Sequence, residues 1–311
     1  MVKVSLIGAG NIGGTLALLL ASFNVGEIIL FDVVEGLPQG KALDISHAAS
    51  LLNFNTKIIG TNDLNDIKDS QICVVTAGVA RKPGMSRDDL LKVNSEIISS
   101  LAENIKSKCP GAIVIVVTNP LDAMAWLFFK KSGFNKSKVV GMAGVLDSAR
   151  YAFHISEKAG LNPSQISAMV LGGHGDDMVT VRSLTRLAGF PAGYFLGENE
   201  LSEIENRVKN SGAEVVSLLK TGSAFISPAA SCFTMIKAII SDEKKVLPSS
   251  CYLEGEYNLN DIYIGVPCIL GRNGVEKVLE VSLDEKETEQ MMASAARVRG
   301  LLEQLKSWYS L

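Results

Sequence analysis

The stretch Gly8-Ala9-Gly10-Asn11-Ile12-Gly13 stands between a strand pattern at 2–7 and a Leu- and Ala-rich helical pattern at 12–22. The run 27–32 then has the pattern of a second strand and ends at Asp32. A turn without side chains lets backbone N–H groups and a helix N-terminus approach a pyrophosphate. A carboxylate after the second strand can accept hydrogen bonds from a ribose diol and repels a 2′-phosphate. This order of features predicts a site for NAD rather than NADP.

Apolar strand patterns alternate with helical patterns through the first half of the chain, which indicates a parallel sheet covered by helices. The runs 72–77 and 112–118 are continuously apolar, as is typical of strands buried on both faces. We therefore expect an α/β fold with a Rossmann-type, doubly wound parallel sheet. The expected strands are 2–7, 27–32, 56–60, 72–77, 112–118 and 138–141, and the expected helices are 12–22, 38–49, 87–108 and 121–132.

The pattern changes after about residue 145, so we expect an NAD-binding Rossmann domain over 1–144 and an α+β substrate domain over 145–311. No linker rich in Pro, Gly or Ser separates them. We expect the halves to pack tightly, with the site between them at the carboxyl ends of the parallel strands. The second half predicts helices at 145–159, 200–219, 224–241 and about 284–308, with Ser282 as a candidate N-cap for the last, and antiparallel strands at 245–253 and 261–270.

Composition excludes several classes of protein. The chain has 311 residues, 47% of them apolar, with 30 basic and 33 acidic residues. No basic stripe with interleaved aromatic residues is present, so we expect no nucleic-acid partner. We also expect no signal peptide and no membrane span, since no apolar run reaches about 20 residues. The five cysteines form no CxxC pair, which favours reduced thiols in a cytoplasmic protein and no metal site.

His174 is the strongest candidate for acid–base chemistry among only three histidines. Glycines flank it and an apolar run precedes it, so its imidazole would project from a strand end into a cleft. Asp147 and Arg150 are three residues apart near the start of a helix and share one face. They could form a surface ion pair, or they could orient a histidine and bind a carboxylate. His154 lies on the same face but roughly 10 Å from Asp147 along the axis, which makes it a weaker candidate.

Polar residues also follow the buried strands. The segment 77–87 is basic and contains Gly and Pro, which is typical of a loop that closes over a ligand but also of a solvated loop. It carries Arg81 and Arg87. Asn119 follows the strand at 112–118 and could present its amide to a small ligand. Asn94 could be a solvated helix position, and Ser223 could be only an N-cap.

Together these stretches resemble the lactate/malate dehydrogenase superfamily. The resemblance rests on 8–13, Asp32, 81–87, Thr118-Asn119-Pro120, Asp147-Ser148-Ala149-Arg150 and Gly172-Gly173-His174-Gly175-Asp176, which occur in the order of that family. The sequence is most similar to the bacterial branch of malate dehydrogenases that are lactate-dehydrogenase-like. The resemblance implies reversible, NAD-dependent oxidation of (S)-malate to oxaloacetate.

The resemblance also implies roles for individual residues. His174 would be the general acid/base, Asp147 would stabilise its imidazolium form, and Arg87 would polarise the substrate carbonyl. The substrate-binding residues would be Arg81, Arg87, Asn119, Arg150 and Ser223. The NAD-binding residues would be Gly8, Gly10, Asn11, Ile12, Gly13, Asp32, Asn94, Val117 and Asn119.

Arg81 would select the substrate. In the superfamily that this chain resembles, the residue at the matching position is Gln in lactate enzymes and Arg in malate enzymes. Oxaloacetate carries a second carboxylate where pyruvate has a methyl group, and a guanidinium supplies the charge and geometry to bind it. The partner implied is therefore a small dicarboxylate.

Three other functions compete with this one. An L-lactate or other 2-hydroxy acid dehydrogenase would share most of the site. An NAD-dependent glycosidase would need a metal held by Cys and His, yet Thr118-Asn119-Pro120 contains no Cys. A non-catalytic NAD-binding protein would not need His174, Asp147 and the arginines. The superfamily forms dimers and tetramers, and apolar faces at 38–49 and 224–241 favour a homodimer or homotetramer.

Overall fold

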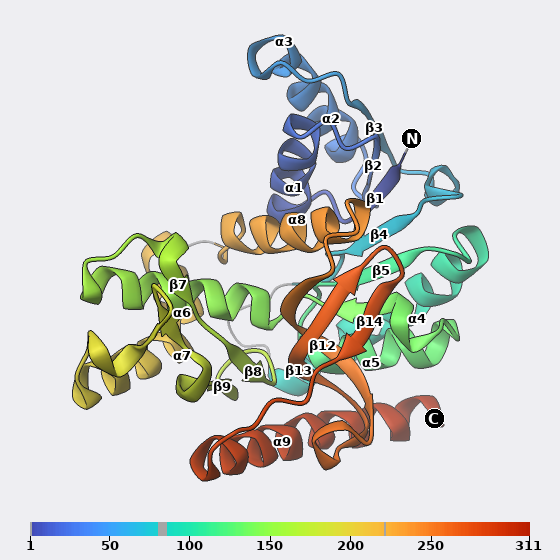
Figure 1. Ribbon diagram of the computed structural model, residues 1–311. Coiled ribbons are helices and arrows are strands. Elements are labelled where there is room, and N and C mark those ends of the chain that lie inside the picture. The colour runs from blue at the N-terminus through green and yellow to red at the C-terminus, as the bar shows by residue number, and fades with distance from the viewer. Residues whose placement is uncertain (1, 80–85, 221) are drawn as a thin grey trace.

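A parallel sheet forms the centre of the protein, whose computed structural model describes residues 2–79, 86–220 and 222–311 (Figure 1). The parallel strands lie in the order β3-β2-β1-β4-β5-β6, which is the order of a doubly wound dinucleotide-binding sheet. The expected fold class is therefore confirmed. The strands are β1 (Lys3–Ile7), β2 (Glu27–Phe31), β3 (Lys57–Thr61), β4 (Ile72–Val75), β5 (Ile113–Val116) and β6 (Val139–Gly141).

Helices cover both faces of this sheet. They are α1 (Asn11–Ser22), α2 (Leu37–His47), α3 (Ala49–Leu52), α4 (Arg87–Lys108) and α5 (Leu121–Ser132), with 3-10 turns at Leu64–Ile67 and Lys136–Lys138. Pro38 lies in the first turn of α2, where its missing N–H costs no hydrogen bond. Gly133 ends α5 in the left-handed conformation that favours glycine. The single helix expected at 38–49 is instead two, separated at Ala48.

The second half continues the same sheet. β12 (Lys245–Glu254) lies antiparallel to β6, with Ser250 opposite Gly141, and β13 (Asn260–Gly271) lies antiparallel to β12 as expected. β8 (Val170–Gly172), β9 (Met178–Thr180) and β14 (Gly274–Val278) complete it. A small separate sheet joins β7 (Ile166–Ser167), β10 (Arg186–Leu187) and β11 (Phe190–Pro191). The apolar run that precedes His174, at 167–171, therefore divides between two sheets, and β9, β10, β11 and β14 were not expected.

The helices of the second half pack against one another and against helices of the first half. They are α6 (Gly144–Ala159), α7 (Glu198–Leu219), α8 (Ile226–Ile240) and α9 (Glu285–Tyr309), with 3-10 turns at Pro163–Gln165, Arg182–Leu184, Ala192–Tyr194 and Glu256–Asn258. Figure 1 shows α6 and α7 in a lobe beside the sheet and α8 next to α1. The rings of Phe23 and Phe233 join α1 to α8, with centroids 4.6 Å apart. One hydrophobic core extends from Val4 to Leu305, so the halves pack tightly as expected.

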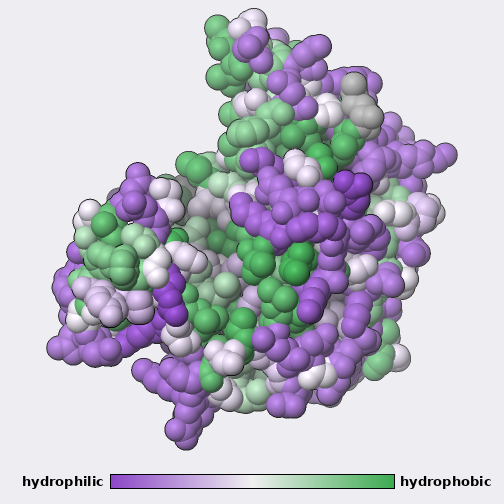
Figure 2. All heavy atoms as spheres, viewed as in Figure 1, coloured by the Kyte–Doolittle hydropathy of each residue, from purple (hydrophilic) through white to green (hydrophobic). Residues whose placement is uncertain are grey.

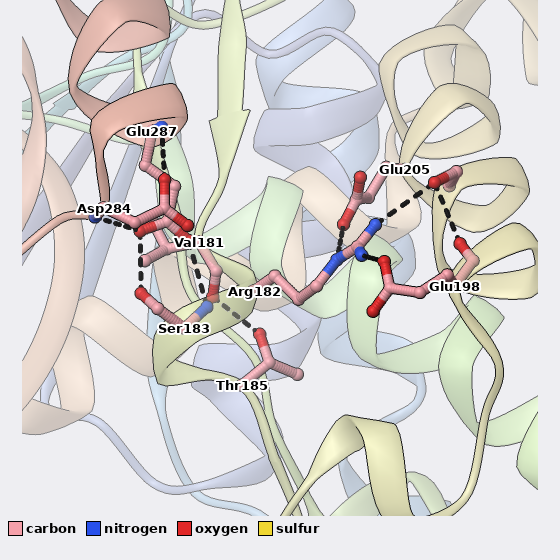
Figure 3. A network of polar contacts seen from close by, with 9 residues as sticks. Val181, Arg182, Ser183, Thr185, Glu198, Glu205, Asp284 and Glu287 are labelled. Atoms are coloured by element: carbon pink, nitrogen blue, oxygen red, sulfur yellow. Dashed lines mark hydrogen bonds and ion pairs between the residues drawn. The ribbon is translucent and has the colours of Figure 1, made fainter.

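The N-cap expected at Ser282 is wrong, because α9 begins two residues later. The cap is Asp284, whose Oδ1 accepts from the Glu287 N–H at 2.7 Å, while Glu287 Oε2 accepts from the Asp284 N–H at 3.0 Å. Both Ser282 and Asp284 have a glutamate three residues later, so the local capping pattern fits either. A tertiary contact favours Asp284, because the carboxylate of Glu287 also accepts from the N–H and hydroxyl of Ser183 (Figure 3).

Glu287 links α9 to the segment that carries Ser183, and the neighbouring Arg182 links that segment to α7 through Glu205 at 2.7 Å (Figure 3). Glu287 is only 4% exposed. Glu287→Ala would remove the acceptor of the partly buried hydrogen bonds from Ser183 and Asp284, so we expect the free energy of unfolding in urea to fall by about 1–3 kcal/mol. Glu285→Ala in the same turn removes an exposed carboxylate and should cost less than about 0.5 kcal/mol. Equal losses in both variants would contradict this role for Glu287.

Candidate active site

The glycine turn at 8–13 leaves β1 and begins α1. Gly8 has φ +118, and a Cβ there would lie 2.5 Å from Thr76 Oγ1. A Cβ on Gly13 would lie 1.9 Å from the Gly8 carbonyl oxygen, so only glycine lets α1 approach the strand so closely. A Cβ on Gly10 would meet no atom of the described residues within 4 Å. The fold itself therefore requires glycine at Gly8 and Gly13, whereas Gly10, at the N-terminus of α1, has room for a Cβ among the described residues.

This difference predicts opposite effects for two alanine variants. Gly13→Ala should lower the free energy of unfolding by about 1–3 kcal/mol through the clash with Gly8. Gly10→Ala should leave the melting temperature unchanged and weaken NADH binding by about tenfold, the effect of losing one charge-assisted hydrogen bond to a phosphate. Thermal unfolding and NADH fluorescence titration measure the two effects. Unchanged NADH affinity in Gly10→Ala would show that the ligand does not approach this turn.

Asp32 and Lys41 hold the turn from two sides. Asp32 Oδ2 accepts from the Ala9 N–H at 2.7 Å and its Oδ1 accepts from the Val34 N–H at 3.0 Å. The Lys41 ammonium donates to the Gly10 carbonyl oxygen at 2.8 Å. A cleft of about 440 Å³ opens beside them, and it is lined by Gly8, Gly10, Phe31, Asp32, Val33, Val34, Thr76, Ala77, Gly78, Val79, Ile97 and Leu101.

The shape and chemistry of this cleft fit a dinucleotide. The free face at Gly10 and the N-terminus of α1 suit a pyrophosphate, and the half-buried Asp32 suits a ribose diol. Asn11 and Ile12 open α1 at the same place. A larger hollow of about 580 Å³ lies between α1 and α8 at the amino ends of the strands, where Phe23 and Phe233 line it, and it contains none of the predicted site residues.

His174 and Asp147 meet as predicted. His174 lies on the turn between β8 and β9, and its Nδ1 is 2.8 Å from Asp147 Oδ2 on α6. Asp147 is buried, and the His174 side chain is 13% exposed. Burial by itself would lower the pKa of His174, but the charge and hydrogen bond of Asp147 outweigh it and hold that pKa above its usual value. The pair therefore favours a protonated imidazole whose Nδ1 is held by Asp147.

Arg150 joins the same cluster. Its guanidinium lies 3.4 Å from Asp147 Oδ1, and its side chain is only 16% exposed. The spacing of three residues therefore gives a largely buried pair, not the surface ion pair that was its alternative. His154 is hydrogen-bonded to Ser211 at 3.1 Å, away from Asp147, as expected for a packing residue.

The end of β5 supplies the other polar groups. Asn119 is exposed after β5, and Val117 is buried beside it. Asn94 is buried on α4, not solvated. Its Oδ1 accepts from the Val79 N–H at 2.8 Å, and its Nδ2 donates to the Asn119 carbonyl oxygen at 2.7 Å. Asn94 thus ties the cleft wall to the strand end through backbone atoms.

Three predicted site residues have no described contact with His174, Asp147 or Arg150. Arg81 and the side chain of Arg87 lie outside the described residues, although the backbone of Arg87 begins α4. Ser223 is exposed and lies three residues before α8. The N-cap position of α8 is Phe225, so the interpretation of Ser223 as a cap is wrong.

The sequence did not single out several residues that contact the site. Asp122 and Ser294 accept hydrogen bonds from the backbone of the His174 turn, Ser250 donates to Asp122, and Lys41 contacts the glycine turn. Among the described residues, no cluster of three His, Cys, Asp or Glu side chains could hold a metal ion. None of the helices that the structure describes has the length and apolarity needed to cross a membrane.

Known proteins match the chain over nearly its whole length. The family model described as "lactate/malate dehydrogenase, NAD binding domain" matches residues 2–141, and that described as "lactate/malate dehydrogenase, alpha/beta C-terminal domain" matches 144–308. Malate dehydrogenase of Roseiflexus sp. (strain RS-1) is 48% identical, over 98% of this chain and 99% of its own.

Solved structures show the same relationship. Cryptosporidium parvum malate dehydrogenase has a TM-score of 0.96 and 45% identity, over 98% of this chain and 99% of its own. The lactate dehydrogenase of the same organism, complexed with lactic acid and nicotinamide adenine dinucleotide, has a TM-score of 0.95 and 41% identity, over 98% of each chain. With its NAD-binding Rossmann half and its α/β C-terminal half, the chain belongs to the lactate/malate dehydrogenase family.

Proposed function

We propose that the protein is an NAD-dependent malate dehydrogenase that interconverts (S)-malate and oxaloacetate. The observation that carries this proposal is the buried pair of His174 and Asp147 with Arg150 beside it. A histidine with a raised pKa can exchange a proton with a hydroxyl or carbonyl oxygen, and an arginine can bind a carboxylate. Relatives such as that of Roseiflexus are named malate dehydrogenase.

His174 moves the proton in this proposal. During oxaloacetate reduction, its Nε2–H donates to the C2 oxygen, and in malate oxidation the neutral ring accepts the hydroxyl proton. Asp147 keeps the proton of Nδ1 in place and stabilises the imidazolium. Because the pKa of His174 is raised, the acid form persists to higher pH, so reduction is favoured below that pKa and oxidation above it.

The arginines bind and polarise the substrate. Arg150 would bind the C1 carboxylate with its planar fork, and Arg87 would stabilise charge that develops on the C2 oxygen. Arg81 would bind the second carboxylate, and Asn119 would donate its amide to the substrate. Ser223 is proposed as a further substrate contact, which its exposure ahead of α8 permits.

The glycine turn and its neighbours would hold NAD, which supplies the hydride acceptor for C2 of malate when it is bound. Gly8 and Gly13 shape the turn, Gly10 gives the pyrophosphate access to the N-terminus of α1, and Asp32 would bind the adenosine ribose. Asn11, Ile12, Asn94, Val117 and Asn119 are the other proposed contacts. Asn94 would act through the backbone segments that its amide holds.

The fold alone does not separate malate from lactate as the substrate, because a lactate dehydrogenase superposes almost as well as a malate dehydrogenase. Arg81 is the feature that favours the dicarboxylate. The test is NADH oxidation measured in parallel with oxaloacetate, pyruvate and longer 2-keto acids, then repeated with NADPH. Faster turnover of pyruvate would overturn the substrate, and faster use of NADPH would overturn the role of Asp32.

We propose further that the protein is a homodimer or homotetramer. Large apolar side chains are exposed on α2 and α3, where Leu43 is 59% and Leu51 84% exposed, and Figure 2 shows hydrophobic residues at this tip of the molecule. Ile226 at the start of α8 is 65% exposed. Exposed apolar area of this kind favours association. Sedimentation velocity would give the number of subunits.

We also propose a domain boundary between residues 144 and 145 and a cytoplasmic location. The first family model stops at residue 141 and the second starts at 144, β6 ends before this boundary, and α6 begins at Gly144. All five cysteines are free and buried, which suits a reducing compartment.

A further inference from the structure

Asp122 is a buried charge that the proposed reaction does not use. It lies in the first turn of α5 and is 5% exposed. Its Oδ2 accepts from the backbone N–H of His174 at 2.8 Å, and its Oδ1 accepts from the Ser250 hydroxyl at 2.6 Å. Burial raises the pKa of Asp122, while the hydrogen bonds from Ser250 and His174 oppose that effect by stabilising the ionised carboxylate. α5 belongs to the cofactor half, whereas His174 and Ser250 belong to the other half.

We infer that Asp122 is a positioning residue for His174, which fixes the backbone of the base against the cofactor half and stabilises the imidazolium by its charge. This inference rests on the proposed role of His174 as acid and base. Asn119, which would contact both substrate and NAD, lies three residues before Asp122. The hydrogen bond from His174 to Asp122 therefore relates the position of the base to that of the bound ligands through a few residues.

The packing of the turn supports the positional part of this role. The N–H of Gly173 donates to Ser294 Oγ on α9 at 2.8 Å, so two successive amides of the turn are bound by side chains. A Cβ on Gly173 would lie 3.0 Å from Val298, 3.3 Å from Ser294 Oγ and 3.5 Å from Asp122 Oδ2. The turn is therefore enclosed between α5 and α9, and its backbone has little room to shift.

The charges around the imidazole support the electrostatic part. Asp147 and Arg150 face His174 from α6 and Asp122 faces it from α5, while Asp177 at the end of the turn is paired with Arg297 of α9. Burial lowers the pKa of His174, Asp147 and Asp122 raise it, and Arg150 lowers it. Asp122 thus adds a second negative charge beside the one that contacts the ring.

Asp122→Asn separates charge from shape, because asparagine keeps an oxygen for the His174 N–H and has almost the same size. The chain has only three histidines, so NMR of ¹⁵N-labelled histidine can follow His174 in the substrate-free protein. We expect the titration midpoint of His174 to fall by about half a pH unit to one unit, while that of His154 stays unchanged. The alkaline limb of oxaloacetate reduction should move down by the same amount. An unchanged His174 midpoint would overturn the inference.

Ser294→Ala is the matched control, because it removes the other anchor of the turn without changing any charge. We expect the His174 midpoint to stay the same in this variant, and a fall equal to that in Asp122→Asn would assign the effect to loosening of the turn and overturn the electrostatic role. If Asp122→Asn does not fold, Ser250→Ala gives the second test. This variant removes the Ser250 hydroxyl, whose O–H dipole offsets part of the charge of Asp122. The titration midpoint of His174 should therefore rise, and a fall would contradict the inference.

These measurements also keep the inference apart from the proposed function. The NMR titration needs no substrate, so a shifted midpoint in a protein that reduces no oxaloacetate would contradict only the function. An active parent whose Asp122→Asn variant shows no shift would contradict only the role of Asp122.

Discussion

His174→Asn is expected to lower kcat for oxaloacetate reduction by about 10³-fold, which is the usual contribution of a positioned general acid. Asparagine keeps a polar side chain of similar reach but cannot carry the proton. The parent should also lose activity in reduction as pH rises through the raised pKa of His174, because the acid form is then depleted. In the variant that alkaline limb should disappear. Steady-state rates with NADH over a range of pH measure both effects.

His154→Asn is the matched control for this variant. His154 is also buried and lies on α6, but its ring is hydrogen-bonded to Ser211 rather than to Asp147. We expect this variant to keep the pH profile of the parent. NADH binding should be intact in both variants. An alkaline limb that survives in His174→Asn would mean that another group supplies the proton.

Residues close together in the sequence explain why the centre of this site could be predicted. Asp147 and Arg150 are one helical turn apart, so their spacing alone placed them on one face. The glycine turn and Asp32 belong to one strand–helix–strand unit whose geometry is nearly fixed. His174 stood out by its flanking glycines. In each case local chain geometry carries most of the information.

The supporting contacts come from distant parts of the chain, and no local pattern reveals them. Asp122 is 52 residues from His174, and Ser294 is 121 residues from Gly173. Asn94 has the sequence setting of a solvated helix position, yet tertiary packing buries it against Val79. The start of α9 also depends on a distant residue. Ser282 and Asp284 both fit the local capping pattern, and the contact of Glu287 with Ser183 distinguishes them.

Arg81→Gln is expected to lower the ratio of kcat/KM for oxaloacetate to that for pyruvate by about 10⁴-fold, since a site built around a polar contact strongly rejects the analogue that lacks it. Arg81 follows Val79, which lines the cleft, by two residues. With glutamine there, the second carboxylate of oxaloacetate would lose the cationic partner proposed for it, and an anion removed from water without a partner is costly. The methyl group of pyruvate leaves no charge unpaired. Parallel NADH-oxidation assays of parent and variant give the ratio.

Two further variants separate the guanidinium of Arg81 from the general charge of its segment. Lys82→Gln removes one positive charge from the next position and should leave the substrate ratio close to that of the parent. Arg81→Lys keeps the charge but loses the planar fork, so it should fall between parent and Arg81→Gln. A ratio that is the same in Arg81→Gln and the parent would show that another group binds the second carboxylate. Because the lactate and malate enzymes of this family share one fold, choice of substrate must then lie in a different side chain of the same site.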